Sequence, residues 1–362
     1  MAWLVGHRPS RSDLLVIAGF IRPRVLWRGL FVGRPFLSHW SSAVMITLSG
    51  LMVEPLAWLQ SLLIHRQLRA RQLPPDPIVV IGHWRSGTTY LHQLLASDPA
   101  AATVRNSLMV APQVGVLLRP LILPLLARLM SARRPIDAVA WEPKDPQEDE
   151  LCIAKLTIDT NMAGVAFPLD YLVHFRRSVL LTTRRFERLW LHVMRLTWLH
   201  DGANRSHLLI KNPAHSGRIP LLLRAFPKAR FVFLRRDPID SIRSLVQVKQ
   251  RLGALVGLQP PLNARLQVEQ TAAAYQQLMQ AFEASRPSIP EGQLLEVNYK
   301  DLVHQPLETV QRLYQALGLS SWTCAERPIR ERVARASRSY NPDPVVLAPG
   351  SEQRLQKLLC QD

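Results

Sequence analysis

The 362-residue chain is 48% hydrophobic and 20% charged, a balance that is typical of folded globular proteins and excludes wholesale disorder. Lys and Arg outnumber Asp and Glu by 45 to 27, and the resulting formal charge of +18 favours anionic partners such as nucleic acid, anionic lipid or a polyanionic small molecule. Because the sequence has no zinc-finger spacing, aromatic RNA-binding signature or basic heptad region, we do not expect a nucleic-acid partner.

The three cysteines, Cys152, Cys324 and Cys360, lie far apart and include no C-x-x-C pair. This spacing indicates neither a disulfide framework nor a zinc site, and it fits a reducing compartment. An apolar run begins at Leu14, but arginines follow it where a signal peptide would have a small-residue cleavage site. We therefore expect a cytoplasmic protein, either free or peripheral at the inner face of a membrane.

Residues 1–74 carry nine arginines but only two acidic residues, Asp13 and Glu54. The arginines flank an apolar stretch from Phe36 to Ile64 that is long enough to cross a bilayer, yet an ionised Glu54 near its middle would cost about 2.5 to 3.5 kcal/mol there. We expect a helical hairpin that packs on the rest of the protein or on a second subunit of a homo-oligomer. Peripheral membrane contact is the next alternative, and true spanning is the last.

The segment LPPDP at residues 73–77 indicates a stiff linker, because proline fixes φ and disfavours helix in the residue before it. We divide the chain there and near residue 320, into a helical N-terminal region (1–74), a catalytic domain (75–320) and a C-terminal arm (321–362). From residue 78 short β-branched runs alternate with helical periods, a pattern that predicts βαβ units around a parallel sheet. The fold class expected is therefore α/β.

Four strands and four helices are expected in the catalytic domain. The predicted strands are residues 78–81, 208–210, 231–234 and 294–297. The helices that follow them are expected from Thr88, near Arg218, from Ile239, and over residues 307–317 with Gly318 as the stop. An insertion of about residues 100–205 separates the first two units. Its apolar first part, residues 109–130, forms either a lid over the substrate or ordinary packing around the sheet.

The most informative segment is residues 78–89, IVVIGHWRSGTT, which predicts a buried strand, a glycine-bounded turn and the start of a helix. Gly82 and Gly87 have the separation of the first and last glycines of a P-loop, where backbone N–H groups and a helix N-terminus converge on phosphate. The lysine that reaches the β and γ phosphates in nucleotide-hydrolysing P-loops is replaced by Thr88, which disfavours ATP chemistry. The positive charge lies inside the turn, on Arg85. The hydroxyl groups around it, which suit a less charged anion than a triphosphate, belong to Ser86, Thr88 and Thr89.

A second motif, FVFLRRDPIDSIRS at residues 231–244, places Arg236 at the end of a strand and Ser244 eight residues later on the next helix. A planar guanidinium and a hydroxyl near the C-terminal edge of a parallel sheet suit a phosphomonoester. The structural alternative is an ion pair between Arg236 and Asp240 at the helix start, worth only a few tenths of a kcal/mol.

These motifs resemble those of the superfamily of sulfotransferases that use 3′-phosphoadenosine 5′-phosphosulfate (PAPS), whose phosphosulfate loop has the pattern P-R/K-S-G-T-T/S after the first strand. Trp84 stands where proline is usual, but every anion-contacting position is filled. The resemblance covers roughly residues 77–318 and is to the bacterial-type branch. It implies a P-loop-like three-layer fold, a central parallel sheet flanked by helices, and PAPS as the donor, with no metal required.

The resemblance also assigns donor-binding residues. These are Arg85, Ser86, Gly87, Thr88, Thr89, Arg236, Ser244 and Tyr299. In this interpretation Arg236 and Ser244 contact the 3′-phosphate, and Tyr299 in VNYKDL borders the adenine unless it is simply a half-buried tyrosine at a strand end. Arg335 and Arg338 of the C-terminal arm are further candidates, by a looser analogy, for closing over the 3′-phosphate.

Sulfuryl transfer by in-line displacement needs positive charge on the departing phosphate and a base for the proton of the nucleophile. Arg85 is the first candidate for the leaving group, and Lys211, at a strand end where the family carries a lysine, is the second. The base is less clear. The family's histidine position, two residues after the lysine, is Pro213 here, and the family's glutamate position falls among residues 104–107, which include no carboxylate.

Two groups of residues remain as candidates for the base. The acidic cluster Glu148-Asp149-Glu150 resembles a motif of the bacterial-type branch, and we favour Glu148 or Glu150 over His215 and His83. A carboxylate that faces the acceptor would accept its proton, most readily if burial raised its pKa. The alternative is that these acids only begin a helix, where each complements the helix dipole by about 0.3 to 1 kcal/mol.

The sequence thus predicts sulfuryl transfer from PAPS to a hydroxyl or amine of a small-molecule, lipid or glycan acceptor. Two alternatives stay open: a kinase or other NTPase with an atypical P-loop, which would need Mg²⁺ and a lysine near the phosphates, and a non-catalytic basic protein associated with a membrane or nucleic acid. The acceptor itself is not readable from the sequence, because specificity depends on the shape of the insertion and the C-terminal arm.

Overall fold

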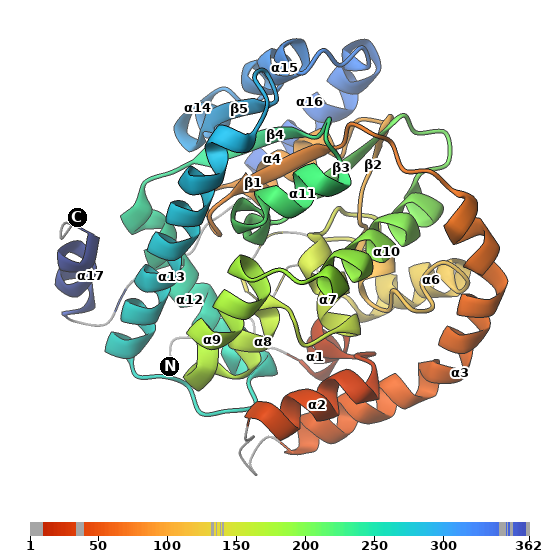
Figure 1. The fold of residues 1–362 in the computed structure, drawn as a ribbon, viewed down its shortest axis with the longest axis vertical. Coiled ribbons are helices and arrows are strands. Elements are labelled where there is room, and N and C mark those ends of the chain that lie inside the picture. The colour runs from red at the N-terminus through yellow and green to blue at the C-terminus, as the bar shows by residue number, and fades with distance from the viewer. Residues whose placement is uncertain are drawn as a thin grey trace.

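Five parallel strands form the centre of the computed structural model, which describes residues 10–33, 40–131, 134, 136, 137, 139, 141–339, 345, 347 and 350–359. The strand order is β2-β3-β1-β4-β5, and helices cover both faces of the sheet (Figure 1). The strands are β1 (Ile78–Gly82), β2 (Ala101–Ala102), β3 (His207–Lys211), β4 (Arg230–Arg235) and β5 (Leu294–Asn298). The predicted α/β, P-loop-like three-layer fold is confirmed.

All four predicted strands are present, within one or two residues of the expected bounds. The two-residue edge strand β2 was not predicted, because a pair of alanines has neither β-branching nor a periodic pattern. β1 lies between β3 and β4, so that Val79 is opposite both Ile210 and Phe231. The carboxyl ends of β1, β3 and β4, which carry the sequence motifs, therefore lie side by side at one edge of the sheet.

Alternate residues of the central strands pack into two separate hydrophobic cores, one on each face of the sheet. Ile78 and Val80 pack with α4 (Thr88–Leu95), α15 (Pro306–Ala316) and α16 (Trp322–Ser339) on one face. Val79 and Ile81 pack on the other face with α10 (Arg184–Asp201), α11 (Ile219–Ala225) and α13 (Ala264–Ser285). Both faces of every central strand are buried, which explains why these strands are continuous apolar runs rather than alternating ones.

The insertion between β2 and β3 is largely helical. Its elements are α5 (Asn106–Met109), α6 (Arg119–Leu129), α7 (Asp149–Leu156), α8 (Asn161–Ala166), the 3₁₀ turn Pro168–Asp170, α9 (Tyr171–Phe175), the π-helical turn Arg176–Leu180 and α10. After β4 come α12 (Pro238–Val256) and α13, and after β5 come α14 (Tyr299–His304), α15 and α16. As predicted, Gly318 follows the end of α15, directly after the C-cap Leu317, and its φ of +63° suits glycine at this position.

The N-terminal region forms α1 (Arg11–Ala18), α2 (Pro23–Gly33) and α3 (Trp40–Ala70) at the edge of the molecule (Figure 1). The prediction of a hairpin between residues 36 and 64 is wrong: residues 36–39 lie outside the described residues, and the rest belongs to the single 31-residue helix α3. This helix continues through Pro55, and Glu54 beside it forms a 2.7 Å ion pair with Arg22. By length and hydropathy alone α3 is a candidate membrane span, with 33% of its most apolar window buried.

The C-terminal part of the described chain packs on the sheet and on α13. Ala325 and Ile329 of α16 are fully buried against the core that includes α4. The short helix α17 (Ser351–Leu359) lies beside α13, where Leu355 is buried and Arg354 pairs with Glu269. The expected domain boundary near residue 320 falls in the loop between α15 and α16. Of the cysteines, Cys152 is buried, Cys324 is exposed, and Cys360 lies outside the described residues.

Candidate active site

The loop after β1 has the backbone geometry of an anion cradle. Gly82, Arg85 and Gly87 all have positive φ, at +141°, +69° and +97°. Arg85 is the only one of the three with a side chain, and it holds the left-handed conformation that most residues avoid. No side chain caps α4 at Gly87, so the first N–H groups of the helix point into the loop without a partner from its own turn.

Both glycines are required by close neighbours. A Cβ at Gly82 would lie 2.8 Å from the carbonyl oxygen of Leu234, and one at Gly87 would lie 2.6 Å from the Tyr299 ring. Ser216 fixes the end of β1 through two hydrogen bonds: its hydroxyl accepts from the Gly82 N–H and donates to the Gly82 carbonyl oxygen, both at 2.9 Å. The loop is therefore held rigidly between β4, the segment after β3 and the start of α14.

The hydroxyls of this loop fall into two groups. Ser86 is buried, and its hydroxyl donates to the His83 carbonyl oxygen at 2.7 Å, so the predicted contact of this hydroxyl with an anion is not set up in the structure. Thr88 and Thr89 instead line a cavity that opens in front of the loop. Of the loop residues, Trp84, Arg85, Gly87, Thr88 and Thr89 line this cavity.

The second predicted anion site lies directly against the first. Arg236 donates to the Arg85 carbonyl oxygen at 2.7 Å, and its guanidinium lies 4.2 Å over the centre of the Tyr299 ring. Arg85 in turn donates through Nε to the Ser244 hydroxyl at 3.0 Å. The alternative ion pair between Arg236 and Asp240 does not form, since Asp240 lies 3.6 Å from Arg243 instead.

Some buried polar atoms near the start of α12 have no hydrogen-bond partner among the described residues. Arg236 Nε and the Ser241 hydroxyl are buried without a hydrogen bond. Leaving such donors unpaired in the interior costs about 1 to 3 kcal/mol each, and an anionic ligand in the cavity would satisfy the donor of Arg236, which lines it. Of these residues, Arg236 lines the cavity, whereas Ser241 and Ser244 do not.

A carboxylate from the insertion also reaches Arg85. Asp137 pairs with Arg85 at 2.8 Å and with Arg134 at 2.6 Å, and only 5% of its side chain is exposed. Burial by itself would raise the pKa of Asp137, but the two guanidinium groups hold that pKa below its ordinary value. The insertion therefore contacts the anion loop through charged groups, a role that its apolar sequence did not suggest.

Lys211 and Glu148 meet in front of the loop, at the end of β3 and the start of α7. Their Nζ and Oε2 atoms are 3.0 Å apart, and Lys211 Nζ is 3.4 Å from the Thr89 hydroxyl. Lys211 is almost completely buried, whereas 18% of the Glu148 side chain is exposed, and both residues line the cavity. The structure thus joins the predicted cation to one predicted base.

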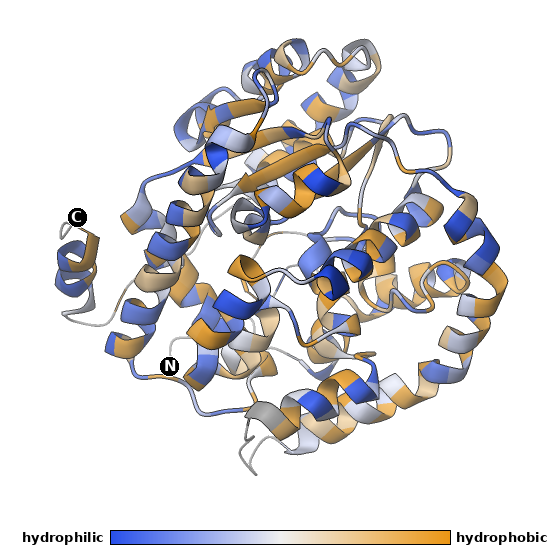
Figure 2. Cartoon of the chain, in the orientation of Figure 1, coloured by the Kyte–Doolittle hydropathy of each residue, from blue (hydrophilic) through white to orange (hydrophobic). Residues whose placement is uncertain are grey.

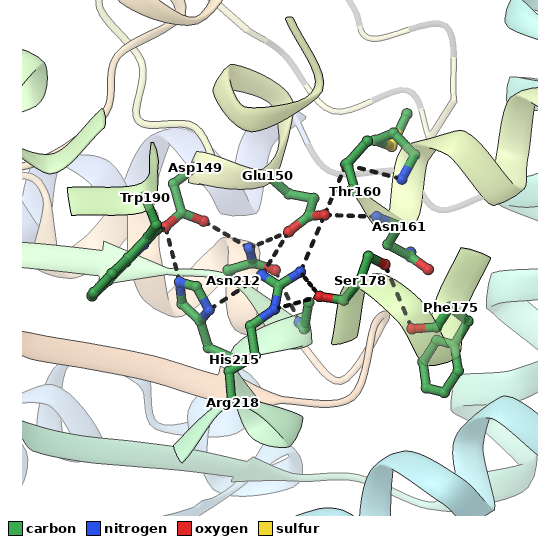
Figure 3. Close-up of polar contacts among 12 residues, drawn as sticks. Asp149, Glu150, Thr160, Asn161, Phe175, Ser178, Trp190, Asn212, His215 and Arg218 are labelled. Atoms are coloured by element: carbon green, nitrogen blue, oxygen red, sulfur yellow. Dashed lines mark hydrogen bonds and ion pairs between the residues drawn. The ribbon is translucent and has the colours of Figure 1, made fainter. Parts of the chain in front are cut away.

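Directly behind this pair lies a buried polar network, drawn in Figure 3. Asn212 donates to Asp149 at 2.7 Å and to Glu150 at 2.8 Å. Asp149 also accepts from His215 at 2.9 Å, and Glu150 forms a 2.9 Å ion pair with Arg218. Burial alone would raise the pKa of both carboxyls, but His215 and Arg218 respectively are the main groups that keep each pKa below its ordinary value.

The positions of Glu150, His215 and His83 correct their prediction as candidate bases. Glu150 and His215 are at most 1% exposed, turn into the network, and do not line the cavity. His83 is also buried away from the cavity, against Trp84 and Tyr275, and burial lowers its pKa to about 3. A base must come within hydrogen-bond reach of the acceptor, and among the predicted candidates Glu148 has that access.

The cavity has a volume of about 420 Å³ and two chemically different ends. The polar end is formed by the anion loop, Lys211, Glu148, Arg236 and Tyr299. The other end is largely apolar, and its lining includes Ile17, Met109, Ile136, Val139, Trp141, Leu151, Met162, Val165, Leu245, Val248 and Leu252. Arg335 of α16 lines the cavity and contacts Glu142 at 3.3 Å, whereas Arg338 is exposed and bonds within its own helix.

One cavity residue that sequence reasoning missed is Lys249 on α12. Its Nζ lies 3.2 Å from the centre of the Tyr171 ring and 3.1 Å from the Thr271 hydroxyl. Burial lowers the pKa of Lys249 to about 7. The available signal was a lysine inside the apolar stripe Leu245, Val248 and Leu252, at the i, i+3, i+4, i+7 spacing of one helix face.

The arrangement provides groups that a transfer between an anion and an apolar molecule needs: a loop with the backbone geometry of an anion cradle, several cations, the accessible carboxylate of Glu148 and many apolar lining residues. Within the described part of the chain, no group of three or more His, Cys, Asp and Glu side chains is placed to hold a metal ion. The expectation that no metal is required stays a prediction.

Comparison with known protein families gives one match over most of the catalytic region. The model of the sulfotransferase family matches residues 77–323. Omega-hydroxy-beta-dihydromenaquinone-9 sulfotransferase Stf3 from Mycobacterium bovis and its counterpart from Mycobacterium tuberculosis are each 28% identical to this chain over 314 residues. The matched region covers 85% of this chain and 80% of each relative.

Two solved structures share the fold. The sulfotransferase STF9 from Mycobacterium avium superposes with a TM-score of 0.66 at 19% identity, over 86% of this chain and 81% of that one. The sulfotransferase STF1 from Mycobacterium tuberculosis gives a TM-score of 0.60 at 19% identity, over 90% of this chain and 93% of that one. At this identity the likeness concerns the fold.

Proposed function

This chain belongs to the sulfotransferase family, and on that premise we propose that its cavity binds PAPS at the polar end and an apolar, hydroxyl-bearing acceptor at the other. Family membership makes the protein a transferase of sulfuryl groups. The identity of the donor, the residues that act and the chemical class of the acceptor belong to the proposal.

The donor assignment is supported by two anion sites in contact with each other. The loop at residues 82–89 suits the 5′-phosphosulfate, because uncapped N–H groups of α4 converge there with Arg85. Arg236 lines the same cavity and keeps an unpaired Nε donor, which suits the separate 3′-phosphate. A triphosphate would call for a lysine after Gly87, and that position is Thr88.

In the proposed transfer, the acceptor oxygen attacks the sulfur and forms a new O–S bond as the bond from sulfur to the 5′-phosphate oxygen breaks. Glu148 takes the proton of the acceptor hydroxyl, and adenosine 3′,5′-bisphosphate leaves with the electron pair of the broken bond. Lys211 and Arg85 stabilise the negative charge that develops on the departing phosphate. Thr89, 3.4 Å from Lys211 Nζ, orients the ammonium group towards the loop.

The observation that carries the proposal is the pair of Lys211 and Glu148, placed between the anion loop and the apolar end. It puts a cation and a proton acceptor at the junction where donor and acceptor would meet. The buried network behind it fixes both partners, since Glu148 precedes Asp149 and Lys211 precedes Asn212 in the chain. Without this support the two side chains would be free to turn away.

The acceptor class follows from the apolar end of the cavity. Eleven apolar side chains line it, which favours a hydrocarbon-rich molecule over a glycan. The relatives named as omega-hydroxy-beta-dihydromenaquinone-9 sulfotransferases also favour a hydrocarbon-rich acceptor, because that name describes a hydroxyl at the end of an apolar chain. We therefore propose a primary alcohol on a long apolar chain as the acceptor.

The donor proposal is tested by calorimetric titration of the protein with adenosine 3′,5′-bisphosphate in the absence of metal, beside ATP with Mg²⁺. We expect binding of the bisphosphate alone, weakened about 10- to 100-fold in Arg236→Ala, because a charged hydrogen bond contributes about 1.5 to 3 kcal/mol. The exposed Arg312→Ala on α15 is the matched control and should bind normally. Binding that requires ATP and Mg²⁺ would overturn the donor assignment.

The acceptor proposal needs a separate assay. Purified protein is incubated with PAPS and either a long-chain primary alcohol in micelles, an omega-hydroxylated prenyl quinone or a soluble sugar. Sulfated product is then followed by mass spectrometry. Turnover of the two apolar alcohols and not of the sugar is expected, and turnover of the sugar alone would contradict the acceptor class while leaving the donor site intact.

A further inference from the structure

The long N-terminal helix α3 presents a row of large apolar side chains to solvent. We call this row, together with exposed residues of α2, the outer face. On α3 it consists of Val44, Leu48, Leu51, Met52, Trp58, Leu59, Leu62 and Leu63, which are 37–76% exposed. At 100° per residue these positions lie within less than half the helix circumference, so they form one continuous stripe along about five turns.

The opposite side of α3 is bound to the rest of the protein along its length. Ile46, Ala57 and Ile64 are buried in three different apolar clusters. Gln60, also buried, donates to the Pro112 carbonyl oxygen at 3.1 Å and accepts from two backbone N–H groups of the insertion. The orientation of α3 is therefore fixed, and the outer face is the side that cannot turn inward.

The outer face continues onto α2, which lies beside α3 in Figure 1. Phe31 is 89% exposed and Trp27 is 42% exposed, and the Trp27 ring lies 6.0 Å from that of Trp40 at the start of α3. Figure 2 shows orange, apolar segments along α2 and α3 at the rim of the molecule. Exposed apolar surface of this extent is unusual for a soluble monomer and marks an interaction site.

Positive charge lies on α2 and beyond the C-terminal end of the stripe. Arg24 and Arg28 are exposed on α2, and Arg66 and Arg69 are exposed near the end of α3, with no ion pair to another described residue. Glu54 is the one carboxylate of α2 and α3, and Arg22 neutralises it; the hydrogen bond from Arg22 holds the pKa of Glu54 below its ordinary value.

We propose that the outer face lies in the interfacial layer of an anionic lipid bilayer, with α3 parallel to the membrane plane. An apolar stripe with unpaired arginines beyond its end and on the neighbouring α2 matches the two layers of such a surface, the acyl chains and the anionic headgroups. The helix lies on the membrane rather than crossing it, because crossing would carry the packed catalytic core and the buried Gln60 into the hydrocarbon. A second copy of the chain would bring the same four arginines close to the outer face again, which disfavours a self-association surface.

The inference goes beyond the proposed function but fits it spatially. α1 lies between the outer helices and the cavity: Leu14 and Ala18 pack in one cluster with α2 and α3, whereas Ile17 lines the apolar end of the cavity. One helix thus separates the proposed membrane surface from the proposed acceptor site. An acceptor that resides in the bilayer would have a short path to Glu148.

The test is flotation of the full-length protein with vesicles of phosphatidylcholine, alone or mixed with phosphatidylglycerol, over a range of salt concentrations. The wild type is expected to float with the mixed vesicles. Met52→Glu with Leu62→Glu should lower vesicle binding at least about tenfold, because two carboxylates would enter the apolar layer. The matched control, Gln311→Glu with Gln315→Glu on exposed α15 at the opposite end of the molecule, adds the same charge and should bind normally.

Replacing Arg24, Arg28, Arg66 and Arg69 by Gln should remove the preference for phosphatidylglycerol and flatten the salt dependence, while binding to plain phosphatidylcholine persists weakly. Calorimetric binding of adenosine 3′,5′-bisphosphate is measured on every variant and is expected to stay unchanged, which shows that each folds. No flotation of the wild type, or equal flotation of the outer-face and control variants, would overturn the proposal. So would a wild-type dimer in analytical ultracentrifugation that the outer-face variant converts to monomer.

Discussion

Glu148, Asp149 and Glu150 are consecutive acidic residues at the start of α7, but their side chains lie in opposite environments. Glu148 faces the cavity, pairs with Lys211 and keeps 18% of its side chain exposed. Asp149 and Glu150 are 1% exposed and turn into a network whose donors occupy their oxygens. The comparison shows that residue type does not separate a reactive carboxylate from a structural one. What separates them is whether the oxygens are already saturated by fixed donors and whether a second molecule can reach them.

The sharpest test of this difference is Glu148→Gln. The amide keeps the size of the side chain and an oxygen for Lys211, but it cannot accept a proton. We expect turnover to fall about 10²- to 10⁴-fold, with bisphosphate affinity and melting temperature close to those of the wild type. Steady-state kinetics beside calorimetry separate the two effects. Turnover within about threefold of the wild type would remove Glu148 from the mechanism.

The structural role of the buried network is tested by Arg218→Met. This change leaves Glu150 without its cation in a site that is closed to water, and we expect a loss of about 3 to 5 kcal/mol in the free energy of unfolding. The double variant Arg218→Met with Glu150→Gln should recover part of that loss, because the amide still accepts from the Asn161 N–H. Urea denaturation measures both. A variant of unchanged stability but abolished turnover would place this pair with the reacting groups instead.

The sequence predicted the sheet and the anion loop because both depend on local patterns. Buried parallel strands are continuous apolar runs, and the glycines at 82 and 87 are needed for backbone reasons that spacing alone reveals. It failed for the region between residues 36 and 64, where Pro55 and Glu54 suggested a break. Packing of the inner side of α3 and the ion pair with Arg22 outweigh the hydrogen bond that proline removes.

The site was predictable only in part for a related reason. Lys211, Arg236 and the acidic cluster stand out in the sequence because they follow strands or begin a helix. Glu148 precedes α7 as its N-cap, whereas Glu150 lies in the first turn, and the inward direction of Glu150 is set by Asn212 and Arg218, far away in the chain. Long-range partners of this kind leave no periodic signal.

The rigidity of the cavity's polar end is tested by Gly87→Ala. The new Cβ would lie 2.6 Å from the Tyr299 ring, at a φ of +97° that alanine avoids. We expect a loss of stability of about 1 to 3 kcal/mol and bisphosphate binding weakened by at least about tenfold, since the ring that supports Arg236 must move. Gly253→Ala on α12, where nothing lies within 4 Å of the new Cβ, is the control and should leave binding unchanged. Equal effects of the two substitutions would show that the loop does not need its fixed geometry.

Lys249 lines the cavity, as Glu148 does, but it is buried, as Asp149 and Glu150 are. Its titration provides the test with the smallest expected effect. Burial lowers its pKa from 10.5 to about 7. Between those two pH values the unfolded chain holds a proton that the folded chain has released, so the contribution of Lys249 to stability rises with pH through this window and is constant below about pH 7.

Lys249→Met should therefore lose stability relative to the wild type as pH rises from 7.5 to 9.5, by up to about 1 kcal/mol per pH unit. Urea denaturation at several pH values measures this slope, and the exposed Lys228→Met should run parallel to the wild type. Parallel curves for Lys249→Met as well would mean that the amine stays charged over the Tyr171 ring, and Lys249 would then count among the cations of the cavity.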